Sequence, residues 1–264
     1  MRLGERTLVP PPRAGLFVTC LVDLMRPSIG FAAARLIEAT GCTVCVPEQQ
    51  TCCGQPAYNS GDRTTAKVLA LQTIRPFADC DYVVAPSGSC AAMLKVHYPR
   101  LFAGEPDLEA EARVFAAKVH ELCTFLTEIR PLDEVPGRYH GRVTYHDACS
   151  GLRELGIKSA PRRLLAKVPG IELTEMREPE ACCGFGGLFA VKYADISNAI
   201  LTRKTDTARA ANAELLLAGE LGCLMNMAGK LTRNGIPLAC RHIAEVLAGE
   251  LSDPPIGHGT ALHP

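Results

Sequence analysis

Short apolar runs alternate with longer amphipathic stretches along the chain of 264 residues. In stretches such as 62–78 and 193–212, apolar residues recur at the spacing of one helix face. Alternating strands and helices are typical of parallel sheets with helices on both faces. The pattern therefore predicts an α/β fold. The predicted strands are 16–19, 43–47, 82–86, 142–146, 171–174 and 214–218.

The same order of elements occurs twice. One copy opens with GLFVTC, which ends at Cys20, and the other opens with GRVTYHDAC, which ends at Cys149. A fixed order that repeats within one chain indicates an internal duplication. We therefore predict two tandem Rossmann-like repeats with parallel sheets, related by a pseudo-twofold axis.

The boundary between the copies is predicted at 131–141, where the sequence reads PLDEVPGRYHG. Residues 105–130 before this break have helical periodicity, so the first repeat is expected to end in a linker helix. The predicted segments are, in order, a flexible terminus at 1–14, the first repeat at 15–130, the second repeat at 141–250 and a flexible terminus at 252–264.

Four cysteines recur in order within each copy. Cys20 and Cys52 are 32 positions apart, and Cys149 and Cys182 are 33 positions apart. The triplet Cys-Cys-Gly follows in both copies, and one more cysteine comes 37 or 40 positions after it. Chance is a poor explanation for this agreement. The candidate metal ligands are therefore Cys20, Cys52, Cys53, Cys90, Cys149, Cys182, Cys183 and Cys223.

These cysteines lie at or after the ends of predicted strands. In a parallel sheet the loops at the carboxyl ends of the strands gather along one edge, and ligands bind there. We expect the four cysteines of each copy to converge on that edge. Separate regions of sequence would then form one local cluster of thiols.

The adjacent cysteines favour a polynuclear metal cluster. A disulfide between neighbouring residues is strained, because disulfide geometry requires well-separated Cα atoms. Two neighbouring thiolates can instead bind two different metal atoms. Gly54 and Gly184 permit close approach of the backbone to such a cluster. A helix that begins just after the pair would direct its N–H groups at the sulfur atoms.

Composition excludes several classes of protein. The chain is 47% hydrophobic and 21% charged, with a net charge of zero, which disfavours a nucleic-acid or anionic-membrane partner. No apolar run reaches the roughly 18 residues of a membrane span, and the N-terminal stretch lacks a signal-peptide core. We therefore expect a cytoplasmic protein. Thirteen cysteines in a reducing compartment favour metal or redox chemistry over disulfides.

The other five cysteines have no partner in the repeat. Cys42 and Cys45 form the only CxxC motif, but they overlap a predicted strand, where residues three apart face opposite sides. We therefore do not expect them to form a metal site. Cys80, Cys123 and Cys240 are interpreted as packing residues, because buried cysteine often serves as a small apolar side chain.

These motifs resemble the CCG cysteine-rich domain family of iron–sulfur proteins. That family includes a heterodisulfide reductase chain, the glycolate oxidase iron–sulfur chain and lactate-utilisation protein A, and the resemblance is closest to the last. It covers residues 15–250. The stretches that carry it are LFVTCLVDLMRPSIG, CCGQPAYNSGD, VVAPSGSCAAM, YHDACSGLRELGI and CCGFGGLF.

The resemblance implies a subunit that passes electrons through one or two cysteine-bound iron–sulfur clusters of the [4Fe–4S] type. It implies partners that are the other subunits of a complex oxidising L-lactate or another 2-hydroxy acid. The chain itself is then a non-catalytic or co-catalytic subunit of an oxidoreductase. The absence of a P-loop and of a flavin or nicotinamide fingerprint agrees with this expectation.

One departure concerns the last cysteine of each copy. The full family pattern ends in CxxC and provides five cysteines per site. Here Ser87 and Glu220 replace the first cysteine of that motif, in SGSC and ELGC. Four thiolates suffice for a [4Fe–4S] cubane. A five-cysteine type of cluster would need oxygen from Ser87 or Glu220, so both are candidate cofactor-binding residues.

Polar residues beside the cysteines have two interpretations each. His146 is a candidate cofactor-binding residue, because it can donate a hydrogen bond to cluster sulfur or relay a proton; otherwise His146 and Asp147 close a strand end. Arg153 can bind a carboxylate or pair with Asp147, or it is an exposed helix residue. Ser89, with Ser87, can donate to sulfur or form a turn.

Two alternatives to an electron-transfer subunit stay open. In one, the chain is itself a thiol–disulfide or 2-hydroxy-acid oxidoreductase that acts at a cluster, with Cys52 or Cys53 as a redox thiol. In the other, it is a zinc-binding or metal-free structural protein with the same fold. A substrate-dependent reaction of the isolated chain would indicate the first, and stoichiometric zinc or no metal the second.

Overall fold

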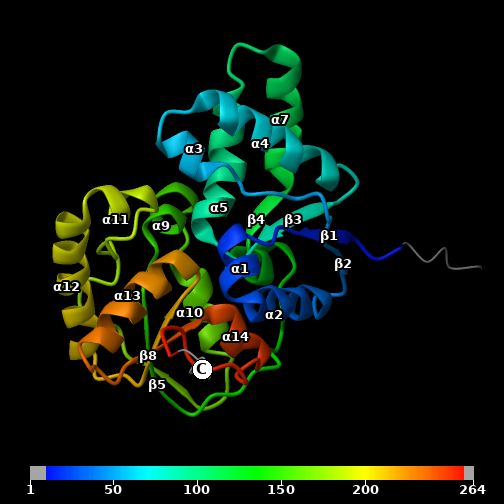
Figure 1. The fold of residues 1–264 in the computed structure, drawn as a ribbon. Coiled ribbons are helices and arrows are strands. Elements are labelled where there is room, and N and C mark those ends of the chain that lie inside the picture. Colours follow the sequence, from blue (N-terminus) through cyan, green and yellow to red (C-terminus); the bar gives the residue numbers. More distant parts are fainter. Residues whose placement is uncertain (1–9, 259–264) are drawn as a thin grey trace, which may run out of the picture.

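Two four-stranded parallel sheets form the framework of the protein (Figure 1). The computed structural model describes residues 10–258. The first sheet has the order β2-β1-β3-β4 and the second β6-β5-β7-β8, so the two halves share one topology. The predicted α/β fold with two tandem repeats is confirmed. The strands are β1 (Arg13–Leu16), β2 (Thr43–Cys45), β3 (Tyr82–Ala85), β4 (Val119–Glu121), β5 (Gly141–Tyr145), β6 (Ile171–Leu173), β7 (Leu215–Ala218) and β8 (Ala239–His242).

Helices connect the strands and cover both sheets. In the first repeat they are α1 (Cys20–Met25), α2 (Pro27–Glu38), α3 (Gln55–Asn59), α4 (Arg63–Ile74), α5 (Gly88–Ala92), α6 (Tyr98–Leu101), α7 (Pro106–Lys118) and α8 (Leu122–Thr124), with a 3₁₀ turn (Arg75–Phe77) and π-helical turns at Met93–His97 and Phe125–Ile129. In the second repeat they are α9 (Cys149–Leu155), α10 (Ser159–Leu165), α11 (Leu188–Lys192), α12 (Ala194–Ala210), α13 (Leu221–Arg233) and α14 (Ile243–Ala248).

Side-chain caps fix where several helices begin. Thr19 Oγ1 accepts from the N–H of Val22, so α1 begins at Cys20. Ser87 Oγ accepts from the N–H of Cys90 at the start of α5. Such caps satisfy N–H groups that have no partner within the helix. They also set the position of each helix's first turn, where the cysteines lie.

The structure corrects three predictions of secondary structure. Residues 105–130 are not one helix, because β4 follows α7 and pairs with β3. A corresponding fourth strand, β8, was also not predicted. In addition, β1 spans 13–16 and not 16–19. Strands of three or four residues contain too few positions to show a period of two, so the helical periodicity around them dominates.

The two repeats pack through reciprocal contacts. Helix α14 of the second repeat packs on α2 of the first, and α8 of the first packs on α10 of the second. Likewise α5 contacts α9, and α13 contacts α1. One core contains buried residues of both repeats, among them Leu16, Ile29, Leu217 and Val246. Equivalent elements therefore exchange equivalent contacts, as a pseudo-twofold arrangement requires.

A buried ion pair joins α2 to α14. Arg26 at the start of α2 donates from Nε to Glu245 Oε1 at 2.8 Å, and Ser28 Oγ donates to the same oxygen at 3.1 Å. The Glu245 side chain is fully buried, and its Oε2 accepts from the N–H of His242 at 3.0 Å. Removing one member of such a pair leaves a buried charge without a partner.

Part of the C-terminal segment packs against the body of the protein. Ile256 is buried, and its N–H donates to the carbonyl of Cys240 at 2.8 Å. Arg26 Nη1 donates to the carbonyl of Pro254 at 2.7 Å. Of the two segments predicted to be flexible, 1–9 and 259–264 lie outside the described residues. Between residues 10 and 258, no helix combines the length and apolar character needed to cross a membrane.

Candidate functional site

The single cysteines of each set lie in the first turns of helices at the carboxyl edges of the sheets. Cys20 and Cys149 are the first residues of α1 and α9, which follow β1 and β5. Cys90 and Cys223 are the third residues of α5 and α13, which follow β3 and β7. The two repeats thus place corresponding cysteines at corresponding positions. Helix N-termini there direct N–H groups and partial positive charge toward the thiols.

The double cysteines lie on loops, each ahead of a left-handed glycine. Gly54 has a φ of 80° and Gly184 a φ of 81°. A Cβ on Gly184 would lie 2.5 Å from the carbonyl oxygen of Ser197, so only glycine fits there without a shift. The N–H of Gly184 donates to Cys182 Sγ at 3.3 Å. In the first repeat α3 begins directly after Gly54, whereas in the second α11 begins only at Leu188.

All eight cysteines line one cavity of about 280 Å³ between the repeats. Each set contributes two half-buried thiols and two buried ones. Ser87 and Glu220 line the same cavity. The sequence thus predicted a set for each repeat, and the structure brings both sets to one place. The lining cysteines are Cys20, Cys52, Cys53, Cys90, Cys149, Cys182, Cys183 and Cys223.

The thiols of the first set form two close pairs. Cys20 Sγ lies 3.8 Å from Cys52 Sγ, and Cys53 Sγ lies 3.5 Å from Cys90 Sγ. The hydrogen bond from Cys20 lowers the pKa of Cys52 to about 2, and the same bond raises the pKa of Cys20. One thiolate is therefore stabilised within the set. A thiolate is the form that binds metal.

The second set has the same electrostatic pattern. The hydrogen bond from Cys149 lowers the pKa of Cys182 to about 2, while the pKa of Cys149 itself is raised. The pKa of the buried Cys183 is also raised, chiefly by its hydrogen bond to Cys182. Four thiols with one stabilised thiolate form a donor set suited to zinc or to the irons of an iron–sulfur cluster.

Ser87 and Glu220 contact each other across the boundary between the repeats. Ser87 Oγ donates to Glu220 Oε2 at 3.0 Å, and the N–H of Ser89 donates to the same oxygen at 2.9 Å. Burial raises the pKa of Glu220, and the hydrogen bonds from Ser89 and Ser87 oppose that effect. Ser87 and Glu220 thus form a hydrogen bond between the repeats at the wall of the cavity.

His146 is fully buried beside the second set. One of its ring nitrogens lies within 4.8 Å of the sulfur atoms of Cys183 and Cys223, and neither nitrogen has a hydrogen-bond partner. Burial lowers the pKa of His146 to about 3, so the ring is neutral at pH 7. A neutral imidazole beside two thiols can bind a metal or donate a hydrogen bond to sulfur.

Asp147 pairs with Arg162 and not with Arg153. Arg162 Nη1 and Nη2 donate to the two carboxylate oxygens of Asp147 at 2.8 and 3.0 Å. Arg153 is exposed on α9. Ser87 and Ser89 hydrogen-bond to Glu220. Of the two interpretations of Asp147, the structure favours a polar residue that closes the end of β5, here within an ion pair. Arg153 is the exposed helix residue of its two interpretations.

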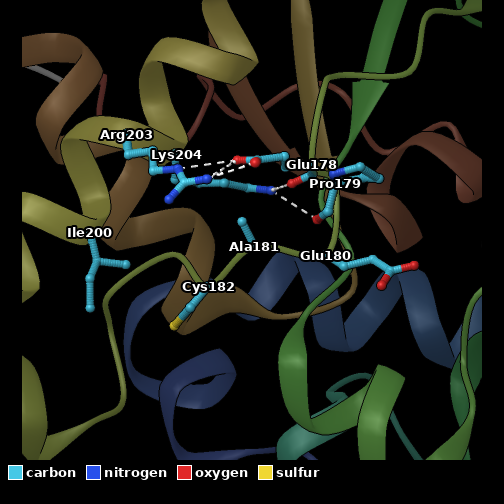
Figure 2. A pocket seen from close by; sticks show the side chains of 8 residues that line it. All are labelled: Glu178, Pro179, Glu180, Ala181, Cys182, Ile200, Arg203 and Lys204. Carbon is cyan, nitrogen blue, oxygen red and sulfur yellow. Dashed lines mark hydrogen bonds and ion pairs between the residues drawn. The ribbon is translucent and has the colours of Figure 1, made fainter.

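A second cavity, of about 570 Å³, lies behind the loop that leads to Cys182 (Figure 2). Arg203 and Lys204 extend from α12 toward this loop. Lys204 Nζ donates to the carbonyl oxygens of Glu178 and Pro179 at 3.0 and 2.8 Å, and Arg203 forms an ion pair with the Glu178 carboxylate. Glu178 has a left-handed φ of 55°. These contacts fix the loop that holds the double cysteine.

Comparison with protein-family models gives a match to the CCG cysteine-rich domain twice, at residues 14–95 and 143–228. The chain belongs to this family. Each matched segment contains one complete set of four cysteines, from the first strand of its repeat to the helix that carries the last cysteine. The CCG domain and the structural repeat therefore coincide over the residues that form the sites.

Several curated proteins are similar to this chain over most of its length. Lactate utilization protein A of Geobacillus kaustophilus (strain HTA426) is 49% identical over 89% of this chain and 98% of its own length. The protein of the same name from Geobacillus thermodenitrificans (strain NG80-2) is 48% identical over the same shares. That from Exiguobacterium sp. (strain ATCC BAA-1283 / AT1b) is 42% identical over 89% of this chain.

A solved structure shares the fold. A hypothetical protein from Helicobacter pylori superposes with a TM-score of 0.63 at 11% identity, over 90% of this chain and 49% of its own. This chain thus spans about half the length of that protein. At this level of identity the likeness concerns the fold alone.

The five cysteines outside the CCG sets lie away from the shared cavity. Cys42 and Cys45, the CxxC pair, do not come together. Instead Cys45 Sγ lies 3.1 Å from Cys80 Sγ, over Gly15 of the central strand β1. A Cβ on Gly15 would lie 2.9 Å from Cys80 Sγ. The sequence did not reveal this pairing, because it depends on a glycine in the strand between the two cysteines.

The sequence also did not reveal the side chains that donate hydrogen bonds to the backbone carbonyls of the double cysteines. Tyr98 Oη donates to the carbonyl of Cys53 at 3.0 Å, and Asn226 Nδ2 donates to that of Cys183 at 3.0 Å. The two donors lie on different helices and at unrelated positions of the repeats. No repeated signal marks them. Lys204 was missed because a lysine within an amphipathic helix is usually exposed.

Proposed function

We propose that this chain is an iron–sulfur electron-transfer subunit of a system that oxidises L-lactate, or another 2-hydroxy acid. The observation that carries the proposal is the convergence of eight cysteines, four from each CCG domain, on one cavity. The name of the curated relatives, lactate utilization protein A, supports the choice of substrate. The partners would be the other subunits of that system, which would hold the substrate site.

The residues fit the proposed cofactor. Four thiols per site match the ligand number of a [4Fe–4S] cluster, and such clusters, when bound, supply one-electron transfer. The first site would be held by Cys20, Cys52, Cys53 and Cys90, and the second by Cys149, Cys182, Cys183 and Cys223. The buried cysteines of each set would exclude water from one side of the site. The half-buried cysteines would face the cavity mouth and the partner.

Other residues would position these ligands. The backbone turns at Gly54 and Gly184 would bring two neighbouring thiolates to one site. Ser87 and Glu220 would fix the distance between the two sites through their mutual hydrogen bond. Oxidation of L-lactate to pyruvate releases two electrons and two protons. In this proposal a partner performs that oxidation, and the chain receives the electrons and passes them to a downstream acceptor.

The first test is the iron, acid-labile sulfide and zinc content of anaerobically purified protein. Two loaded sites would give about eight irons and eight sulfides per chain, and one loaded site about four of each. Cys20→Ser and Cys149→Ser should each lower the iron content by one cluster. Cys45→Ser is the matched control, because Cys45 is also half-buried but lies outside the cavity. Its iron content should equal that of the wild type.

Two results would contradict the proposal in different ways. Stoichiometric zinc, or well-folded protein that takes up neither iron nor sulfide, would favour the structural alternative; His146 with Cys183 and Cys223 gives that alternative a specific zinc site. Oxidation of L-lactate by the loaded chain alone would instead favour an enzyme acting at its own cluster. The loaded chain is expected to show no change in visible absorbance when L-lactate is added without partners.

A further inference from the structure

The helices behind the two double cysteines can be compared position by position. Gly54 faces the carbonyl of Ala66 on α4, and Gly184 faces the carbonyl of Ser197 on α12. With these two residues matched, the buried positions of both helices coincide. Ala66, Ala70, Thr73 and Ile74 correspond in order to Ser197, Leu201, Lys204 and Thr205. At the position where the first repeat has Thr73, the second therefore has a lysine.

Lys204 is a buried cation without a carboxylate partner. It is 1% exposed, and its Nζ donates only to the two loop carbonyls described above. Burial lowers the pKa of Lys204 to about 8, so the ammonium form still predominates at pH 7. The nearby groups whose negative charge would favour the ammonium form are Cys183, Cys223 and Cys182 as thiolates and the carboxylate of Asp147. Arg162 already neutralises Asp147.

The surroundings of the first site have no such charge. Thr73 is fully buried and neutral. When Cys20 is matched to Cys149, His146 and Asp147 correspond to Phe17 and Val18, which are apolar. Across residues 10–258, Lys204 and Arg241 are the buried cations, and Arg241 lies beside Glu245 at the contact between α14 and α2. Glu220 lies between the two sites, because it begins the helix that carries Cys223 and accepts from the N–H of Ser89 beside Cys90, so its carboxylate does not distinguish them.

Building on the proposed function, we propose that Lys204 makes the second site the stronger electron acceptor of the two. Reduction of a cluster by one electron adds one negative charge, and a buried ammonium stabilises that charge because the surrounding dielectric constant is low. Transfer of one electron from the first site to the second oxidises the first by one and reduces the second by one. No atom or proton moves. Lys204 thus acts through its charge, which raises the midpoint potential of the second site, and it does not bind the cluster itself.

Lys204 also holds the loop before Cys182, and the two roles have different consequences. A residue that only clamped the loop would, when replaced, lower the amount of bound iron and leave the potential of the remaining clusters unchanged. A residue that acts by its charge would change the potential at full iron content. The midpoint potential of the second site therefore separates the two roles.

The experiment measures midpoint potentials by redox titration followed by electron paramagnetic resonance. A Cys20→Ser/Cys52→Ser variant leaves only the second site able to load, and a Cys149→Ser/Cys182→Ser variant leaves only the first. The second site should have the more positive potential. In the background with only the second site, Lys204→Met should shift its potential to more negative values. Lys204→Arg, which keeps the charge, should shift it much less.

Arg203→Met is the matched control. Arg203 is adjacent on α12 and carries the same charge, but its side chain is 71% exposed and paired with Glu178. Its replacement should leave the potential of the second site unchanged, since solvent screens an exposed charge. Thr73→Lys, in the background with only the first site, should shift the potential of that site to more positive values. The comparison of the wild-type sites does not depend on the folding of any variant at 204.

The outcomes separate this inference from the proposed function. If no background takes up iron and sulfide, the proposed function is wrong, and this inference is wrong with it. If both sites load and have equal potentials, or if Lys204→Met loads fully with an unchanged potential, the inference alone is wrong. A more negative second site would also overturn it.

Discussion

The four cysteines of each set differ in burial and in charge. Cys53 and Cys183 are each 2% exposed, whereas their neighbours Cys52 and Cys182 are half-buried. The half-buried member of each pair is also the one whose pKa is lowered to about 2. A thiolate that is both accessible and stabilised reacts first with metals and oxidants.

The two glycines after the double cysteines give a prediction with an internal control. Both have left-handed backbones, which cost a residue with a Cβ about 1–2 kcal/mol. A Cβ on Gly54 would have its nearest contact at 3.4 Å, to Leu69, whereas one on Gly184 would meet a backbone carbonyl at 2.5 Å. Gly184→Ala should therefore lower the free energy of unfolding by about 1–3 kcal/mol more than Gly54→Ala does.

Urea unfolding of the metal-free variants, followed by circular dichroism, measures this difference. Equal losses for the two variants would show that the segment at Ser197 yields to the new methyl group. The prediction would then be wrong, because it assumes that the contact between residue 184 and the Ser197 carbonyl is rigid.

The sequence predicted the cysteine sets but not the contacts between them. The sets could be found because their spacing recurs, and recurrence is visible in one chain. The bond between Ser87 and Glu220 joins residues 133 positions apart. It depends on how one repeat lies against the other, which local patterns do not encode. Lys204 was not found for a related reason, since its burial depends on the loop that covers it.

Helix α14 depends on a histidine cap, and this makes stability depend on pH. His242 Nδ1 accepts from the N–H of Ala244 at 3.2 Å, which requires a neutral ring. Burial lowers the pKa of His242 from 6.5 to about 4. As the pH falls below 6.5 the unfolded chain takes up this proton while the folded protein does not. The free energy of unfolding should therefore fall, by about 2 kcal/mol between pH 7 and pH 5 from this residue.

His242→Asn is the variant that isolates this effect. Asparagine caps helices and does not titrate, while Glu245 can still accept from the backbone N–H at 242. The half-buried His120, whose pKa burial also lowers, contributes an acid-induced loss of stability in both proteins. The measurement is urea unfolding of metal-free wild type and variant at pH 7 and pH 5. The same acid-induced loss in both proteins would show that His242 does not contribute.

The length of each helix or strand determined whether the sequence could predict it. The helices at 63–74 and 194–210 agree with the predicted 62–78 and 193–212, because 12 and 17 residues show a clear period. The four-residue strand β7 was predicted from its apolar residues alone, and all four are buried. The edge strand β4 has three residues, one of them a glutamate, so its pattern merges with the helix before it.

The whole molecule should unfold as one cooperative unit. The repeats share a core, and each covers the other with equivalent helices. We expect hydrogen exchange, measured by mass spectrometry, to give the same opening free energy for peptides from β1 and β3 as for peptides from β5 and β7. Two distinct opening free energies would show that the repeats fold independently.

Glu245→Ala tests the same cooperativity through one residue. The variant leaves the largely buried Arg26 and the buried Arg241 without their shared carboxylate, so the opening free energy should fall by about 3–5 kcal/mol in both sheets. Glu250→Ala is the control, because Glu250 pairs with Arg35 at the surface and should contribute less than about 1 kcal/mol. A loss confined to peptides of the second sheet would contradict a shared unit.

The reciprocal packing of the repeats has a consequence for the origin of the molecule. Equivalent helices that exchange equivalent contacts are what two identical chains form in a twofold homodimer. In such a dimer every substitution would appear at both sites. Once the two copies are joined in one polypeptide, each can change alone, as at Thr73 and Lys204 or at Ser87 and Glu220. Gene fusion would thus have allowed the two sites of an ancestral symmetric dimer to become different, so that electrons move from one to the other in a fixed direction.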